Sequence, residues 1–203
     1  MPGSIGGGVL PSYASFAPEE SPTFEFDPDP KWGNGPVRFL FVKDEARHWR
    51  ETVDEDARRR FQAEFWSQRD PTPLTPENEF RSEFLRRVQF ADANFSTEET
   101  RGSVTDRGMV FVVMGPPNYV GRSRVEADQD SMAMTRITEQ KMITTREVWH
   151  YRSDRLIREL PWRELRFEFQ SREGYGEAVL QKHPEVLAAL ASMTRLSANP
   201  SPP

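Results

Sequence analysis

The sequence predicts an α+β domain in which helices come first and a small antiparallel sheet follows. Apolar residues recur at steps of three or four in the first half of the chain, as is typical of an amphipathic helix. This stripe comprises Phe80, Phe84, Val88, Ala91 and Phe95. In the second half the period changes to two, since Leu165, Phe167 and Phe169 alternate with polar residues. Helices followed by strands without regular alternation favour α+β over a doubly wound parallel sheet.

Each helix of the first half has a recognisable start or stop. We expect helices over residues 44–52, 55–69 and 76–95. Asp44 and Asp54 can cap the first two, because their carboxylates accept hydrogen bonds from free backbone N–H groups. Pro71 ends the second helix. Thr75 followed by Pro76 is the strongest helix start, because a hydroxyl cap precedes a proline at the first helical position.

Short apolar runs in the second half predict the strands. They lie at about 108–114, 146–152 and 164–170, and a last helix follows at about 184–196. An earlier apolar run, Val37 to Val42, is interpreted as a short strand or extended entry segment. Gly121 to Thr145 is polar and too long for a tight hairpin, so we expect a mobile flap between the first two strands.

The composition of both ends of the chain predicts tails on either side of one domain at 36–196. Residues 1–30 hold six of the 17 prolines, five acidic residues and no Lys or Arg, a composition that does not repay the entropy of ordering. They form a predicted disordered acidic tail, and 197–203 a second, short one. The first tail has no basic start and no continuous apolar stretch, so neither a signal peptide nor a membrane span is expected in it.

Charge and composition exclude several classes of function. The net charge is −5, and without the five acidic residues of the first tail 27 acidic and 27 basic residues remain. A body without net charge has no long-range field to attract nucleic acid, so we expect no nucleic-acid partner. The absence of cysteine excludes disulfides, thiolate zinc sites and cysteine nucleophiles. His48, His150 and His183 lack metal-pair spacing, so no metal or other cofactor is expected.

Two dense motifs carry a resemblance to a known family. They are Phe65-Trp66 with Arg69-Asp70-Pro71, and Thr105-Asp106-Arg107-Gly108 running on to Gly115-Pro116-Pro117. With Pro73, Thr75 and Asn78-Glu79 in order between them, the stretch from Val37 to Tyr151 resembles the bacterial GWxTD domain family. The chain departs from the naming motif at Ser103, where the family has tryptophan. The resemblance implies an exported or envelope-associated, periplasmic module without an assigned activity, and no catalytic residues.

The charged residues of the two motifs form the main candidate site. Arg69, Asp70, Asp106 and Arg107 lie where the helical half meets the β half. Together with Asn78 and Glu79 they could bind a peptide terminus or carboxylate through the guanidinium groups. The alternative is structural, with Arg69 and Asp106 paired to hold the third helix on the first strand.

Four further residues complete the candidate set. Trp66 lies one residue off the Phe61 to Phe65 row, and is either core or a protein-contact anchor. Gly115 and Pro116 must interrupt the predicted first strand, either to mount a binding loop or simply to end it. His150, between two aromatic residues, is either a general base or a hydrogen-bonded sheet residue.

Two functions follow from these candidates. The first is a non-enzymatic module that binds another protein or a peptide through the face around Arg69, Asp106, Arg107 and Gly115. The alternative is a carboxylate-dependent hydrolase that uses Asp106 and Glu79 with His150. The alternative requires Asp106 and His150 to converge within hydrogen-bond reach or through one water.

Overall fold

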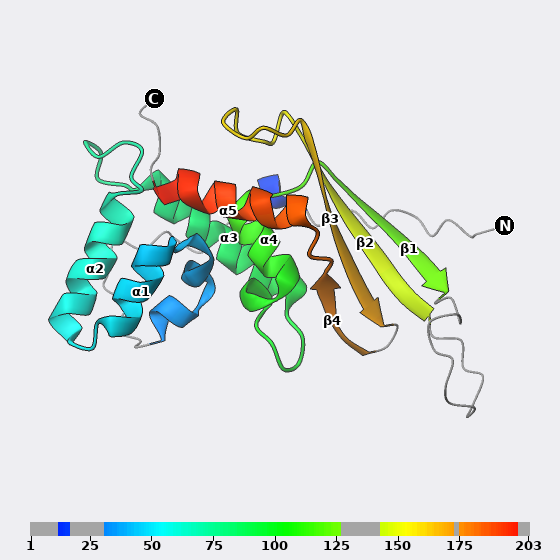
Figure 1. Ribbon diagram of the computed structural model, residues 1–203, viewed down its shortest axis with the longest axis horizontal. Helices are drawn as coiled ribbons and strands as arrows, with labels where there is room; N and C mark the ends of the chain where they lie inside the picture. The colour runs from blue at the N-terminus through cyan, green and yellow to red at the C-terminus, as the bar shows by residue number, and fades with distance from the viewer. Residues whose placement is uncertain (1–11, 17–30, 127–142, 173–174, 199–203) are drawn as a thin grey trace.

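A computed structural model describes residues 12–16, 31–126, 143–172 and 175–198 of the chain (Figure 1). Its main elements are α1 (Lys43–Glu51), α2 (Glu55–Ser67), α3 (Glu79–Phe95), α4 (Asp106–Met114), β1 (Tyr119–Glu126), β2 (Ile143–Arg152), β3 (Glu164–Arg172), β4 (Tyr175–Leu180) and α5 (Pro184–Ala198). Short 3₁₀ turns occur at η1 (Tyr13–Ser15), η2 (Trp32–Asn34), η3 (Pro36–Leu40) and η4 (Gly102–Val104). Helices precede an antiparallel sheet and one helix follows it, so the predicted α+β class is confirmed.

The sheet has the order β1-β2-β3-β4, with each strand antiparallel to its neighbour. Trp149 pairs with Val120 on one side and with Phe167 on the other. Trp149, Tyr151 and Phe167 are fully buried, so this face of the sheet lies against the helices. Because successive side chains of a strand alternate between faces, His150 lies on the opposite, open face.

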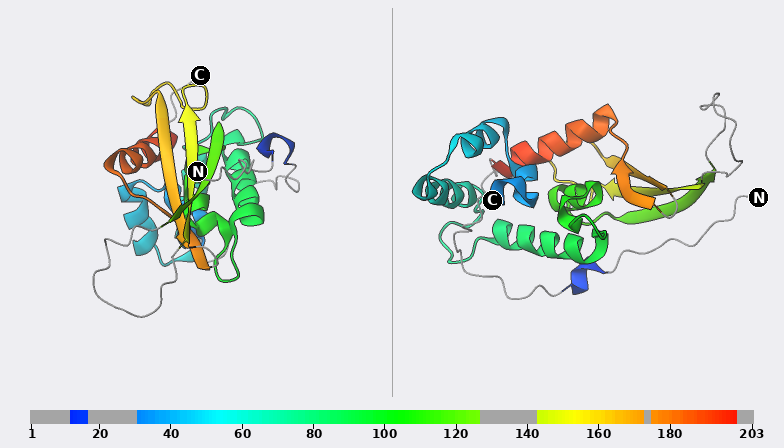
Figure 2. Two further views of the ribbon diagram at one scale, coloured as in Figure 1. Left: turned by 90° about the vertical axis from the view of Figure 1, so that its right-hand side faces the viewer. Right: turned by 90° about the horizontal axis from the view of Figure 1, so that it is seen from below.

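The core has two clusters that meet at α4. One packs α3, α4 and α5 on the covered face of the sheet and includes Phe90, Phe111 and Trp149. The other joins η3, α1, α2 and α3 around Trp49 and Phe65. Figures 1 and 2 show α1 and α2 at the end of the molecule away from the sheet, with α3, α4 and α5 in between.

The predicted strand at 108–114 is wrong, because this segment is the helix α4. The Thr105 hydroxyl accepts a hydrogen bond from the Gly108 N–H at 3.1 Å and caps the helix. Gly115 ends it with a positive φ of 79°, a conformation that glycine adopts without strain. Val110 to Met114 are all buried. A short helix that is buried on every side has no apolar periodicity, so its sequence resembles that of a buried strand.

Other boundaries also differ from the expectations. Helix α3 begins at Glu79 rather than 76, because the Asn78 side chain caps it by accepting from Arg81 N–H. The apolar run after Gly35 forms the 3₁₀ turn η3 rather than a strand. Strands β1 and β4 were not expected, and the ends of the predicted flap belong to β1 and β2. Residues 127–142 of that flap lie outside the described residues.

Part of the predicted first tail is ordered. The turn η1 lies beside α3 (Figure 2), and the Tyr13 ring meets Phe90 and Phe111 edge-on, each with centroids 5.3 Å apart. The contact was not expected because the few aromatic residues of this proline- and glycine-rich stretch show no hydrophobic periodicity. The rest of residues 1–30, and 199–203 at the other end, lie outside the described residues.

Candidate functional site

Arg69 does not pair with Asp106. Its guanidinium is fully buried and forms a two-pronged salt bridge with Glu45 of α1, with both N–O distances 2.8 Å. It also donates to the backbone carbonyl of Leu40 at 3.1 Å and lies over the Phe65 ring. Asp106 instead accepts the Leu180 N–H at 2.8 Å. The predicted pair is therefore wrong, and Arg69 joins α1, η3 and α2 inside the fold.

The neighbours of Arg69 have local structural roles. The Asp70 carboxylate accepts the Thr72 N–H at 3.0 Å and shapes the turn before α3. Trp66 is 5% exposed and packs against Phe84, so it is a core residue. Glu79 accepts the Thr72 hydroxyl, which lowers the pKa of this exposed carboxyl. Trp66 is therefore not available to a partner, whereas the Glu79 carboxyl remains exposed.

The groups required by the hydrolase alternative are separated. Glu79 starts α3, whereas Asp106 starts α4, whose first turn packs at the other end of α3 through Arg107 over Phe95. The helical rise over 16 residues puts the two ends of α3 about 24 Å apart. His150 lies on the open face of the sheet, with Nδ1 3.6 Å from Glu164 Oε1 and its ring 5.5 Å from Tyr119. Asp106 is on a helix that covers the other face, so a direct dyad is excluded.

Arg107 belongs to a charged cluster at the start of α4. Glu147 of β2 is buried and accepts from Arg122 Nε at 2.6 Å and from the Trp149 indole at 2.7 Å. Arg107 lies 3.9 Å from the same carboxylate, and burial lowers the pKa of its guanidinium. This cluster ties α4 to the sheet, since both arginines and the indole share one acceptor.

The glycines of the second motif permit close backbone packing. A Cβ at Gly108 would lie 2.0 Å from the Gly102 carbonyl oxygen, and one at Gly102 would lie 2.0 Å from the Ala91 carbonyl oxygen. Side chains at either position would collide with backbone, which cannot rotate away. Between them Ser103 is fully buried and donates its N–H to Asp92 at 2.7 Å. The motif therefore joins α3, η4 and α4.

The end of α4 leads into a groove. Arg87 of α3 donates to the Val112 carbonyl at 3.1 Å and satisfies the C-terminal end of α4. The Tyr151 hydroxyl donates to the Gly115 carbonyl at 2.8 Å and fixes the chain where it leaves the helix. Pro116 and Pro117 then form part of the wall of a cavity.

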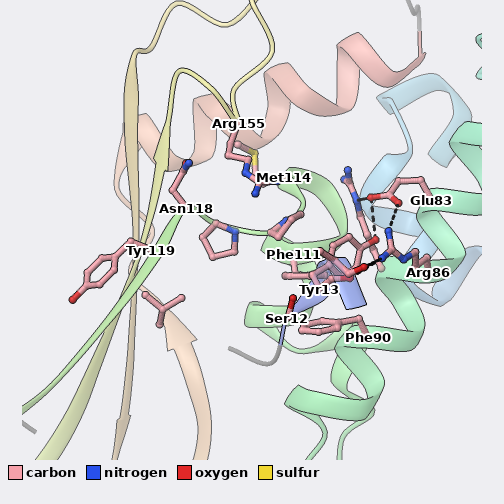
Figure 3. A pocket seen from close by; sticks show the side chains of 15 residues that line it. Ser12, Tyr13, Glu83, Arg86, Phe90, Phe111, Met114, Asn118, Tyr119 and Arg155 are labelled. Carbon is pink, nitrogen blue, oxygen red and sulfur yellow. Dashed lines mark hydrogen bonds and ion pairs between the residues drawn. The ribbon is translucent and has the colours of Figure 1, made fainter. Parts of the chain in front are cut away.

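We call this cavity the α3–β1 groove; its volume is about 670 Å³. Its apolar lining includes Phe90, Phe111, Met114 and Val120. Its polar lining includes Glu83, Arg86, Arg87, Asn118 and Arg155. Figure 3 shows Arg155, Asn118 and Tyr119 on one side, with Tyr13, Glu83 and Arg86 on the other.

Charge in the groove is mainly positive. Glu83 accepts from Arg87 Nε at 2.8 Å and lies 3.8 Å from Arg86. Asn118 is held by Asp154, which accepts from its amide at 2.8 Å. The exposed Arg155 side chain forms no hydrogen bond or ion pair with any other residue that the structure describes.

Of the predicted site residues, Pro116 lines this groove, and Gly115 lies just before it, next to the Arg87 guanidinium. The other groove residues were missed because α4 was interpreted as a strand and Tyr13 as part of a tail. One sequence signal was present, since Tyr13 and Phe16 are three positions apart and the only aromatic residues among the first 20. Arg86 and Arg87 could not be recognised as groove residues from the sequence, because arginines on the solvated face of any helix give the same pattern.

The described residues show neither a metal centre nor a membrane-spanning helix. No group of three or more His, Asp or Glu side chains within the described ranges could hold a metal ion. No described helix combines the length and apolar character needed to cross a bilayer.

Comparison with known proteins identifies one family. No curated protein and no solved structure matches the chain. Residues 32–130 match the model of the GWxTD domain, a stretch that runs from η2 through β1 and includes both motifs. Residues 32–130 of this chain are therefore a GWxTD domain.

Proposed function

We propose that this protein is a non-enzymatic interaction module that holds a segment of a partner protein in the α3–β1 groove. The observation that supports this most is the groove itself, an apolar base bordered by arginines. Aromatic residues, methionine and arginine are enriched where proteins bind one another. The groove provides Phe90, Phe111 and Met114 at the base with Arg86 and Arg155 beside them.

The size of the groove suits part of a peptide. Its volume of about 670 Å³ lies within the range of small-ligand sites. Such a space accommodates a few side chains and is too small for a folded domain. A loop or terminal segment of a partner therefore fits better than a flat protein surface.

The charge of the groove favours an acidic segment. Arg86 and Arg87 share one carboxylate, Glu83, and Arg155 adds a further cation. The guanidinium groups can bind a carboxylate through two parallel N–H donors. We therefore propose a partner segment with apolar residues for the base of the groove and a carboxylate for Arg155.

The location of the partner is proposed from the family alone. The resemblance to the GWxTD domain family suggests a bacterial exported or periplasmic protein, so the partner is sought in the cell envelope. The zero net charge of the chain beyond residue 30 gives no support to a nucleic-acid partner.

The test first captures a partner and then asks whether it uses the groove. A photo-reactive amino acid at Tyr119, which is 56% exposed and lines the groove, crosslinks the partner in cells of the source organism. The purified partner is then titrated with wild type, Arg155→Glu and Arg158→Glu by calorimetry. Arg158 is an exposed arginine of the same connection and does not line the groove, so it is a matched control.

We expect Arg155→Glu to weaken binding at least about tenfold, because a carboxylate in the partner then faces a like charge. Arg158→Glu should stay within about twofold of wild type, as expected for a charge outside the interface. Urea denaturation of the three proteins checks that all are equally folded. Equal affinity for wild type and Arg155→Glu would show that the partner binds elsewhere.

A further inference from the structure

The segment Ser12 to Phe16 is bound to the groove side of α3 and α4 like a short peptide ligand. It forms one 3₁₀ turn, and Ser12, Tyr13 and Ala14 line the α3–β1 groove (Figure 3). The turn therefore lies directly beside the free space proposed for a partner segment.

Two aromatic side chains of the turn contact the same ring of α3. The Tyr13 ring meets Phe90 edge-on at 5.3 Å, and the Phe16 ring meets it at 5.4 Å. Edge-to-face pairs of this kind add to the effect of burial alone. The Tyr13 hydroxyl donates to Glu83 at 3.0 Å, so the surface also recognises the polar end of the ring.

Arg86 recognises the backbone of the turn. Its guanidinium donates to the carbonyl of Tyr13 at 2.6 Å and to that of Phe16 at 3.2 Å, and it lies over the Tyr13 ring at 4.2 Å. The Tyr13 carbonyl also accepts the Phe16 N–H within the turn at 3.2 Å, so Arg86 is a second donor to it, whereas the Phe16 carbonyl at the end of the turn receives its hydrogen bond from Arg86. Contacts to backbone and to two spaced side chains are the combination by which proteins bind short linear segments.

The receptor and the segment belong to different parts of the chain. The receptor residues Glu83, Arg86, Phe90 and Phe111 lie within residues 32–130, which match the GWxTD domain, whereas Ser12 to Phe16 precede that match. Fifteen residues, 17–31, separate Phe16 from Trp32. The module thus binds a segment that is tethered to it.

We infer that this surface is a receptor for a partner segment with two aromatic residues three positions apart on one turn, and that the chain's own Tyr13–Phe16 turn competes for it. This inference rests on the proposed function and names the chemistry of the partner. The turn fills only the α3 side, so a partner that also extends into the α3–β1 groove and reaches Arg155 makes additional contacts. Those contacts allow it to displace the tethered turn.

The tether sets the strength of this competition. Because the turn and the receptor belong to one chain, the turn competes at an effective concentration on the order of 1 mM. If a free peptide binds the empty receptor with a Kd of about 50 μM, the tethered turn weakens its apparent affinity about twentyfold.

The probe for the test is a fluorescent peptide with the sequence of residues 9–20, and fluorescence anisotropy reads its binding. The receptors are full-length chains: wild type, the double variant Tyr13→Ala/Phe16→Ala, and the double variant with Arg86→Ala added. Arg59→Ala in the double variant is the matched control, because Arg59 is an exposed arginine of α2. A peptide with alanine at both aromatic positions tests the side-chain contacts.

We expect the double variant to bind the peptide at least about tenfold more tightly than wild type, because its own turn no longer competes. Adding Arg86→Ala to the double variant should reduce its affinity for the peptide at least about tenfold. Adding Arg59→Ala to the double variant should leave that affinity unchanged. The alanine peptide should not bind. Thermal melts followed by circular dichroism check the fold of each variant. If Arg86 binds the backbone of the peptide, Arg86→Ala should lose binding while its melting temperature stays unchanged.

Several outcomes would overturn the inference. Equal affinity of wild type and the double variant would show that the turn does not compete, and no binding to the double variant would show that no receptor exists. A wild-type dimer that forms at high concentration and is lost in the double variant would make a second copy the occupant instead of a partner. None of these results affects the comparison of Arg155→Glu with wild type in partner binding. Failure of the competing-turn inference is therefore distinguishable from failure of the proposed function.

Discussion

The buried Arg69–Glu45 salt bridge predicts a large loss of stability when its arginine is removed. Arg69→Met keeps the apolar part of the side chain but leaves Glu45, which is 15% exposed, without its cation. The Leu40 carbonyl also loses its donor. Removing one partner of a buried ion pair costs about 3–5 kcal/mol. For a chain of this size that corresponds to a fall in Tm of roughly 6–20 °C.

The assay is urea denaturation followed by tryptophan fluorescence, with the exposed pair of Arg47 and Asp44 as control. In that pair the side chains are 59% and 80% exposed, so Arg47→Met should change the free energy of unfolding by no more than about 0.5 kcal/mol. Replacing both Arg69 and Glu45 by methionine should recover part of the loss, because no unpaired charge remains. A loss below about 1 kcal/mol for Arg69→Met would refute the reasoning, since the pair would then behave like a surface contact.

Three further predictions follow from other contacts. Gly108→Ala should cost about 3 kcal/mol or more in urea denaturation, because its Cβ would lie 2.0 Å from a backbone oxygen; a cost below about 1 kcal/mol would contradict the close packing. Ser103→Ala should raise the free energy of unfolding by about 1 kcal/mol, because it removes a buried hydroxyl that has no partner among the described residues; a loss of stability would mean that the hydroxyl is hydrogen-bonded. Burial and the Glu83 carboxylate raise the pKa of Tyr13 above that of a free tyrosine, so its contribution to docking is complete below about pH 10 and is lost as the pH rises further. The residue 9–20 peptide should therefore lose affinity for the Tyr13→Ala/Phe16→Ala chain between pH 9 and 11, whereas its Tyr→Phe analogue should not, and equal profiles would contradict this assignment.

Local patterns were sufficient for the helices with one apolar face and for the strands with alternating faces. Helix α3 was predicted because Phe84, Val88 and Phe95 face the core while the opposite side is polar. Strand β3 was predicted because Leu165, Phe167 and Phe169 are buried and the residues between them are not. In both cases one side meets water, so the pattern along the chain records which side is buried.

Segments that are buried on all sides, or held by distant contacts, were not predictable in this way. The run Val110 to Met114 is apolar throughout, and only the Thr105 cap and packing between α3 and the sheet make it a helix. The predicted pair of Arg69 and Asp106 was wrong for a related reason, because the partner of Arg69 lies 24 residues earlier in the chain. No local pattern records which acidic residue a buried arginine meets.

The sequence by itself determined the family, the α+β class, and the absence of cysteine chemistry, because these depend on residue identity, order and local periodicity. The tertiary structure alone decided that Arg69 is internal, that Asp106 and His150 serve opposite faces of the sheet, and that Tyr13 contacts α3 and α4. The α3–β1 groove belongs to this second group. Its walls come from residues 12–14, α3, the end of α4 and the connection around Arg155, and only folding brings segments so distant in the chain to one surface.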